Sequence, residues 1–154
     1  MMNAKNNPFQ NKNTTSIKVL LVDDNKRTRK GLRAMLATAH LNPFEASCTQ
    51  ITIVGEAENG QKALQMVETT QPNVVIMDLQ MPIMDGLQAT KKIKAAFPNV
   101  KIIILTIYAD SRTTALEASA DAFLIKGCNT TELIDTIYSL HTNIHKQRKE
   151  KKDV

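Results

Sequence analysis

Five short apolar segments alternate with five longer amphipathic ones along the chain, and this alternation restricts the fold more than any other feature of the sequence. Val, Ile and Leu run almost without interruption through three of the apolar segments, which is typical of strands buried on both faces of a parallel sheet. The predicted strands are IKVLLVD (17–23), ITIVGEA (51–57), NVVIMDL (73–79), KIIILT (101–106) and DAFLIK (121–126).

A stretch with helical periodicity follows each apolar segment. Leu64 and Val67, for example, fall on the same face of the second stretch. Asp85 and Asn129 precede two of the stretches with the spacing of helix caps, and we expect Asp110 to cap a short one. The predicted helices cover residues 25–39, 59–70, 85–97, 110–118 and 129–144.

A strand followed by a helix, repeated five times, predicts an α/β fold. Right-handed crossovers make such strands parallel and place helices on both faces of the sheet. For a chain of 154 residues, the sequence predicts a single flavodoxin-like, doubly wound sheet of five strands in the order 2-1-3-4-5. We expect this domain to span residues 16–145, after a disordered tail (1–15) and before a basic tail (146–154). The connection over 40–50 is long and has no assigned role.

Charge and composition exclude several classes of function. The net charge of +5 belongs to the two ends, because residues 16–140 hold equal numbers of acidic and basic side chains, which argues against nucleic-acid binding by the domain. No apolar run approaches the roughly 20 residues that span a membrane. Cys48 and Cys128 form no CxxC motif, so we expect two reduced thiols in a cytoplasmic protein.

Polar side chains end four of the five predicted strands. Asp23 and Asp24 end the first strand, Asp78 the third, Thr106 the fourth and Lys126 the fifth. Each has an ordinary explanation by itself, such as a helix cap or a strand residue. Together they matter, because ligands of an open α/β sheet bind at the carboxyl ends of its strands.

Three clustered carboxylates would repel one another, by about 4 kcal/mol for a pair 4 Å apart at an effective dielectric constant near 20. One lysine does not balance them, whereas Mg²⁺ prefers oxygen ligands of this kind. A carboxylate nucleophile, a divalent cation, a hydroxyl and an ammonium group suit phosphoryl transfer to an aspartate. The chemistry does not distinguish Asp78 from Asp23 or Asp24, but the central position of its strand favours Asp78.

The segments VLLVDDN, VVIMDLQMPIMDG, IIILT and FLIKG resemble the blocks of two-component response-regulator receiver domains, the CheY-like family, over roughly residues 16–145. GLRAML, VGEAENGQKAL and LTIYAD resemble the NarL/FixJ type in particular. The resemblance implies a module that takes a phosphoryl group from a sensor histidine kinase or a histidine phosphotransfer protein. It implies catalysis of its own phosphorylation and dephosphorylation only.

The resemblance also implies a role for each site residue. Asp78 would be the phosphoacceptor, Asp24 a direct Mg²⁺ ligand, Asp23 a ligand through water, and Gln80 a ligand through its backbone carbonyl. The switch residues would be Thr106, Lys126 and the aromatic Phe123. They would carry the change to the face formed by the fourth helix, fifth strand and fifth helix, which would bind an output partner or a second copy.

Some features depart from the family pattern. Gly127 stands where many receivers have Pro, and Ile107 where a small residue is usual. The resemblance would also place Gln80 and Tyr108 beside the phosphate, where the family tunes the rate of dephosphorylation. Mainly because the bulky Ile107 would narrow access for the phosphodonor, a pseudo-receiver that binds partners without phosphorylation is the alternative. No DNA-binding helix-turn-helix pattern follows, so we expect a stand-alone receiver or the receiver portion of a longer NarL-type transcription factor. Gln80 argues against a haloacid dehalogenase, which needs a second Asp there, and DDNKRT lacks the glycines of a flavin phosphate loop.

Overall fold

A computed structural model of the chain describes residues 15–39 and 49–150, and within them strands and helices alternate as the sequence predicts. The strands are β1 (Ser16–Val22), β2 (Gln50–Ala57), β3 (Val74–Met77), β4 (Lys101–Thr106) and β5 (Ala122–Ile125). The helices are α1 (Lys26–Ala37), α2 (Gly60–Thr70), α3 (Gly86–Ala96), α4 (Arg112–Glu117) and α5 (Thr130–Glu150), with a 3-10 turn, η2 (Ala109–Ser111), before α4.

The five strands form one sheet in the order β2-β1-β3-β4-β5, and every neighbouring pair is parallel. The predicted doubly wound α/β fold and its strand order are therefore confirmed. The order places β1 and β3 side by side at the centre, with Val22 opposite Met77. The residues that follow these two strands consequently emerge next to each other.

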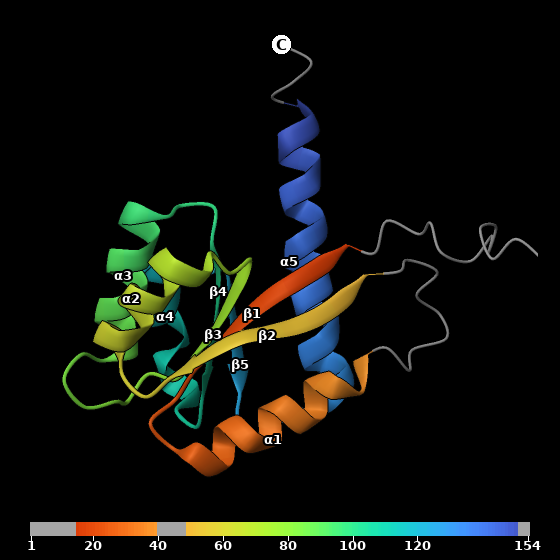
Figure 1. The fold of residues 1–154 in the computed structure, drawn as a ribbon. Coiled ribbons are helices and arrows are strands. Elements are labelled where there is room, and N and C mark those ends of the chain that lie inside the picture. The colour runs from red at the N-terminus through yellow and green to blue at the C-terminus, as the bar shows by residue number, and fades with distance from the viewer. Residues whose placement is uncertain (1–14, 40–48, 151–154) are drawn as a thin grey trace, which may run out of the picture.

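Helices cover both faces of the sheet: α1 and α5 pack on one face, and α2, α3 and α4 on the other (Figure 1). Successive side chains of a strand point to opposite faces. In β3, Val74 and Ile76 pack toward α1 and α5, whereas Val75 and Met77 pack toward α2, α3 and α4. All four are buried, which explains why the segment is apolar without interruption.

Side chains start the helices at most of the predicted places. The Asp85 carboxylate accepts a hydrogen bond from Gln88 N at 2.8 Å, and the Asn129 amide oxygen accepts one from Glu132 N at 2.8 Å, so both predicted caps are confirmed. The predicted cap at Asp110 is wrong. Asp110 lies inside η2, and α4 begins at Arg112 without a side-chain cap, because a 3-10 turn closed by Ser111 N and Tyr108 O leads the chain into the helix.

The last helix, α5, extends beyond the residues that show apolar periodicity. α5 continues to Glu150, past Ile144, and so includes residues 146–150 of the expected basic tail; Lys, Gln, Arg and Glu are all good helix formers. Outside the described residues lie 1–14 and 151–154 of the expected tails and 40–48 of the long connection over 40–50, which includes Cys48. Gln50, the last residue of that connection, already belongs to β2. Within the described ranges, no helix is both long enough and apolar enough to cross a membrane.

Candidate functional site

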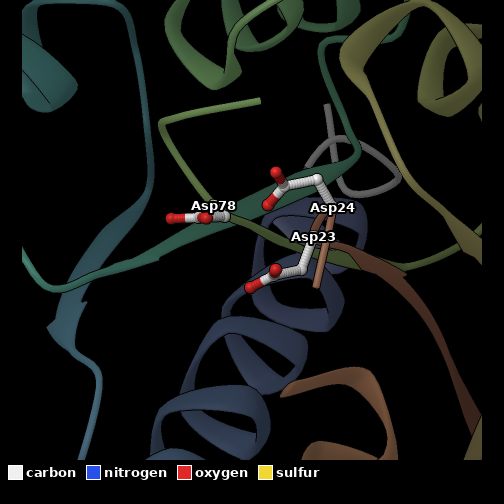
Figure 2. A group of neighbouring side chains, drawn as sticks. All are labelled: Asp23, Asp24 and Asp78. Atoms are coloured by element: carbon white, nitrogen blue, oxygen red, sulfur yellow. The ribbon is translucent and has the colours of Figure 1, made fainter. Parts of the chain in front are cut away.

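Three carboxylates meet at the carboxyl edge of the sheet, where β1 and β3 end (Figure 2). Asp23 and Asp24 follow β1 and Asp78 follows β3; one carboxylate oxygen from each lies within 4.8 Å of the others. The backbone extends the sheet into the site, because Asp78 N donates to Val22 O at 2.9 Å and Asp23 N donates to Ala57 O at 3.0 Å. The structure thus brings the predicted acidic residues together at one rim.

Lys126 bridges two of these carboxylates. Its Nζ lies 2.7 Å from Asp23 Oδ2 and 3.1 Å from Asp78 Oδ2. Burial alone disfavours the ammonium form, but the hydrogen bonds to the two carboxylates outweigh it and raise the pKa of Lys126. Lys126 follows β5, on the far side of β4 from β3, and its long side chain reaches across to the acidic residues.

Backbone N–H groups hold the second oxygen of each bridged carboxylate. Asp78 Oδ1 accepts from Leu79 N at 2.8 Å, and Asp23 Oδ1 accepts from Asn25 N at 2.8 Å. Asp78 is buried, and burial raises the pKa of its carboxyl group above the ordinary value, against the opposing effect of Lys126. Asp23 is buried as well, whereas Asp24 is exposed.

The donor set fits a hard divalent cation. Every candidate ligand is a carboxylate oxygen, and octahedral Mg²⁺ binds oxygens at about 2.0–2.1 Å, so two of its ligands lie about 2.9 Å apart when adjacent and about 4.2 Å apart when opposite. Oxygens within 4.8 Å of one another can share such an ion when some of them move closer and others bind it through a water molecule. Three carboxylates against one ammonium also leave an excess of negative charge for the cation to neutralise.

Thr106 and Phe123 lie on the two strands beyond β3. Thr106 is fully buried at the end of β4, and its Oγ1 accepts a hydrogen bond of 3.3 Å from Tyr108 N. Phe123 is buried in β5, with the Arg112 guanidinium of α4 lying 5.0 Å from the centre of its ring. The ring therefore packs inward, beneath a cation.

A hydrogen bond joins the two loops that border the site. Tyr108 OH donates to Gln80 Oε1 at 2.9 Å, which links the loop after β4 to the loop after β3. Both residues, together with Asp24 and Asp85, line an open pocket of about 630 Å³. The family resemblance placed Gln80 and Tyr108 beside the phosphate, but nothing in the sequence indicated that the two side chains contact each other.

Two further residues were missed by sequence reasoning. A Cβ atom on Gly86 would collide with the carbonyl oxygen of Asp78, so only glycine lets α3 start this close to the acidic site. Arg29 of α1 donates from Nη1 to the carbonyl oxygen of Asp23. The Asp-Gly pair after the third strand was a usable signal for Gly86, whereas Arg29 carried none.

Comparison with known families gives one match that covers most of the chain. Residues 19–138 match the family described as "Response regulator receiver domain".

Relatives of the chain are longer proteins. "Uncharacterized transcriptional regulatory protein YhcZ" of Bacillus subtilis (strain 168) is 42% identical over 122 residues, which cover 78% of this chain and 53% of that protein. "Response regulator protein VraR" of Staphylococcus saprophyticus is 31% identical over 129 residues, 82% of this chain and 57% of VraR. The chain thus spans about half the length of the curated relatives it matches.

Solved receiver structures share the fold. The signal receiver domain of NarL from Mycobacterium tuberculosis superposes with a TM-score of 0.71 at 24% identity, covering 81% of this chain and 95% of that one. The response regulator domain of Thermotoga maritima CheB superposes with a TM-score of 0.69 at 25% identity, covering 81% and 96% respectively. The CheY-like arrangement of five parallel strands is common to them and to this chain.

Proposed function

Because this chain belongs to the response regulator receiver domain family of two-component systems, we propose that it accepts a phosphoryl group on Asp78 with the help of Mg²⁺. The observation that carries the proposal is the cluster of Asp23, Asp24 and Asp78, with the ammonium group of Lys126 paired to Asp23 and Asp78. The phosphoryl donor would be the phosphohistidine of a sensor histidine kinase or of a phosphotransfer protein.

The hydrogen bonds of Asp78 indicate which of its oxygens reacts. Leu79 N holds Oδ1, so Oδ2 is the oxygen that faces Lys126 and acts as the nucleophile. Lys126 favours the ionised carboxylate, which a nucleophile requires, against the effect of burial. A lone pair of Oδ2 forms the new O–P bond while the bond from phosphorus to the donor nitrogen breaks, and the departing imidazole keeps that electron pair and takes up a proton.

Charge on the transferred group needs several partners. Lys126 Nζ, released from Asp78 Oδ2 by the reaction, donates to a phosphoryl oxygen instead. Asp24, Asp78, Asp23 through water and the backbone carbonyl of Gln80 would hold Mg²⁺, which when bound neutralises charge on the phosphoryl oxygens. The third partner is the hydroxyl of Thr106, at the end of β4 next to β3, which would donate a hydrogen bond to another phosphoryl oxygen.

Phosphorylation then changes a surface. We expect Thr106 to turn toward the phosphoryl group and Phe123 to respond, which would alter the face formed by α4, β5 and α5. Phe123 connects the site to this face because it lies on β5, three residues before Lys126, and contacts Arg112 of α4. The face would bind an output partner or a second copy of the chain in the cytoplasm.

A transcriptional output is the second part of the proposal. The relatives of the chain include a transcriptional regulatory protein, and this chain matches about half of its length. The receiver would therefore control an output region or a separate protein, and we assign no nucleic-acid contact to residues 16–145 themselves, where acidic and basic side chains balance.

Phosphorylation by acetyl phosphate and Mg²⁺, measured by intact mass, tests the proposal. We expect the wild-type chain to gain one phosphoryl group and Asp78→Asn to gain none. Asp85→Asn is the matched control: Asp85 lies on the same loop after β3 and lines the pocket beside the site together with Asp24, but its role is to cap α3, which Asn also does, so this variant should be phosphorylated normally. A mass gain that persists in Asp78→Asn refutes the acceptor assignment. No gain with any donor or kinase favours the pseudo-receiver alternative.

A further inference from the structure

We propose that Arg29 is a positioning residue for the cation site, acting on the peptide group that joins Asp23 to Asp24. The inference rests on the Mg²⁺ binding proposed above and adds a residue that touches neither the cation nor the phosphoryl group.

Arg29 lies between the end of β2 and the turn that carries Asp23 and Asp24, called here the acidic turn. Its Nη1 donates to the carbonyl oxygen of Asp23 at 2.5 Å, and its Nε donates to Glu56 Oε2 at 3.0 Å. Its side chain is only 12% exposed, so the guanidinium is largely shielded from competing water. A charged donor in such surroundings makes a stronger hydrogen bond than a neutral one.

The contact acts on the one rigid unit that connects the two acidic residues. A peptide group is planar, so fixing the direction of the Asp23 carbonyl also fixes the position of the Asp24 Cα atom. Asp23 has further anchors at its N–H, its Oδ1 and its Oδ2. Asp24 is exposed, so its carboxylate depends on the orientation of its backbone to stay near the other two.

Glu56 explains why the residue is an arginine. The end of β2 holds the acidic turn in two ways. Ala57 O accepts a hydrogen bond from Asp23 N, and the Glu56 carboxylate orients the Arg29 guanidinium that binds the Asp23 carbonyl. A guanidinium has donors fixed in a plane, so it can bind Glu56 and the Asp23 carbonyl at the same time. The single ammonium of a lysine has a shorter reach and no such fork.

Arg33 provides a matched control, one helical turn further along α1. It pairs with the same glutamate, with Nη2 at 2.7 Å and Nε at 3.0 Å from Glu56 Oε1, but its side chain is 52% exposed. In the described part of the chain its hydrogen bonds go to Glu56 rather than to the acidic turn. Loss of Arg33 therefore removes two hydrogen bonds to Glu56 without releasing the Asp23 carbonyl.

Isothermal titration of the full chain with Mg²⁺ separates positioning from stability. We expect Arg29→Met to weaken Mg²⁺ binding by roughly ten-fold, as is typical when a partner behind the ligands is lost. Arg33→Met should bind Mg²⁺ with an affinity within about two-fold of wild type, because the hydrogen bonds from Arg33 to Glu56 lie outside the cation site. Thermal unfolding without Mg²⁺ checks that each variant is folded at the titration temperature.

Arg29→Lys keeps the positive charge, so it distinguishes a positioning role from a purely electrostatic one. It also replaces Arg29→Met in the test if that variant does not fold. A purely electrostatic role predicts wild-type affinity for Arg29→Lys, whereas positioning predicts weaker binding, since lysine cannot keep both contacts. Wild-type affinity in Arg29→Lys, or in a folded Arg29→Met, overturns the inference and leaves the proposed function standing. Absence of Mg²⁺ binding by the wild-type chain overturns the cation site itself.

Discussion

Gly86 shows how closely a single position can be tied to the site. It is the first residue of α3, its N–H donates to Leu79 O at 2.8 Å, and any Cβ would meet the carbonyl oxygen of Asp78. Backbone atoms cannot rotate away as the end of a side chain can. The helix therefore approaches the proposed phosphoacceptor only because this residue lacks a side chain.

Gly86→Ala and Gly31→Ala form a pair with opposite expectations. Gly86→Ala should lower the free energy of unfolding by about 1–3 kcal/mol, as overpacking typically does. Gly31, in the middle of α1, has open space where a Cβ would lie, with no neighbouring group within 4 Å, so Gly31→Ala should raise it by up to about 1 kcal/mol through helix propensity. Urea unfolding of both variants checks this, and equal effects would show that the close contact with Asp78 relaxes freely.

At the scale of elements, ion pairs join helices to strands outside the acidic site. Arg29 and Arg33 of α1 both pair with Glu56 of β2, and Lys94 of α3 pairs with Asp121 at 3.0 Å, just before β5. The hydrogen bond from Arg33, then that from Arg29, lower the pKa of Glu56 below its ordinary value, although partial burial opposes them. A carboxyl group with a lowered pKa in the folded state stabilises the fold wherever it is ionised.

Glu56→Gln should therefore have a pH-dependent effect on stability. Above the unfolded pKa of about 4.3, wild-type Glu56 is ionised and its contribution is fully present; it is lost as the pH falls through the lowered pKa of the folded state. We expect the variant to be less stable than wild type by about 1 kcal/mol at pH 7, with the difference shrinking below about pH 4. Urea titrations at both pH values, without Mg²⁺, measure it, and a constant difference would contradict this role.

For the whole molecule, the acidic site joins separate parts of the chain. Asp23 and Asp24 follow β1, Asp78 follows β3 and Lys126 follows β5. The side chains that follow these three strands therefore lie next to one another at the same edge of the sheet. In the structure Lys126 supplies the only cation in direct ion-pair contact with Asp23 and Asp78 among the described residues. A divalent ion bound there would hold together chain segments that separate on unfolding.

Mg²⁺ should consequently stabilise the folded protein. A ligand that binds only the folded state adds about 2.7 kcal/mol at a concentration of 100 times its Kd. We expect Mg²⁺ to raise the Tm and a chelator to reverse the rise. Asp24→Asn should lose most of this gain, while Asp110→Asn, another exposed acid that lines the same pocket, should keep it. Differential scanning calorimetry tests this, and an equal gain in both variants would place the ion elsewhere.

Local patterns in the sequence determined the elements and the residues of the site. Uninterrupted apolar runs predicted strands buried on two faces, and right-handed crossovers predicted that these strands are parallel. The assignment of a flavodoxin-like sheet of five strands then gave the observed strand order. Acidic and basic residues at the ends of those strands had to meet, because parallel strands share one carboxyl edge. Asp23, Asp78 and Lys126 were therefore predictable as neighbours without any coordinates, while the chemical roles assigned to them remain predictions.

Contacts between distant segments were decided by the tertiary structure alone. The bonds from Arg29 to the Asp23 carbonyl and from Tyr108 to Gln80 depend on where loops and helix faces come to lie in space. Ile83 has a φ of 70°, in the left-handed region that β-branched residues avoid, and Gly60 N holds the adjoining Met84 carbonyl at 2.9 Å. Periodicity and caps report on interactions within a few residues, whereas these positions depend on the packing of the entire domain.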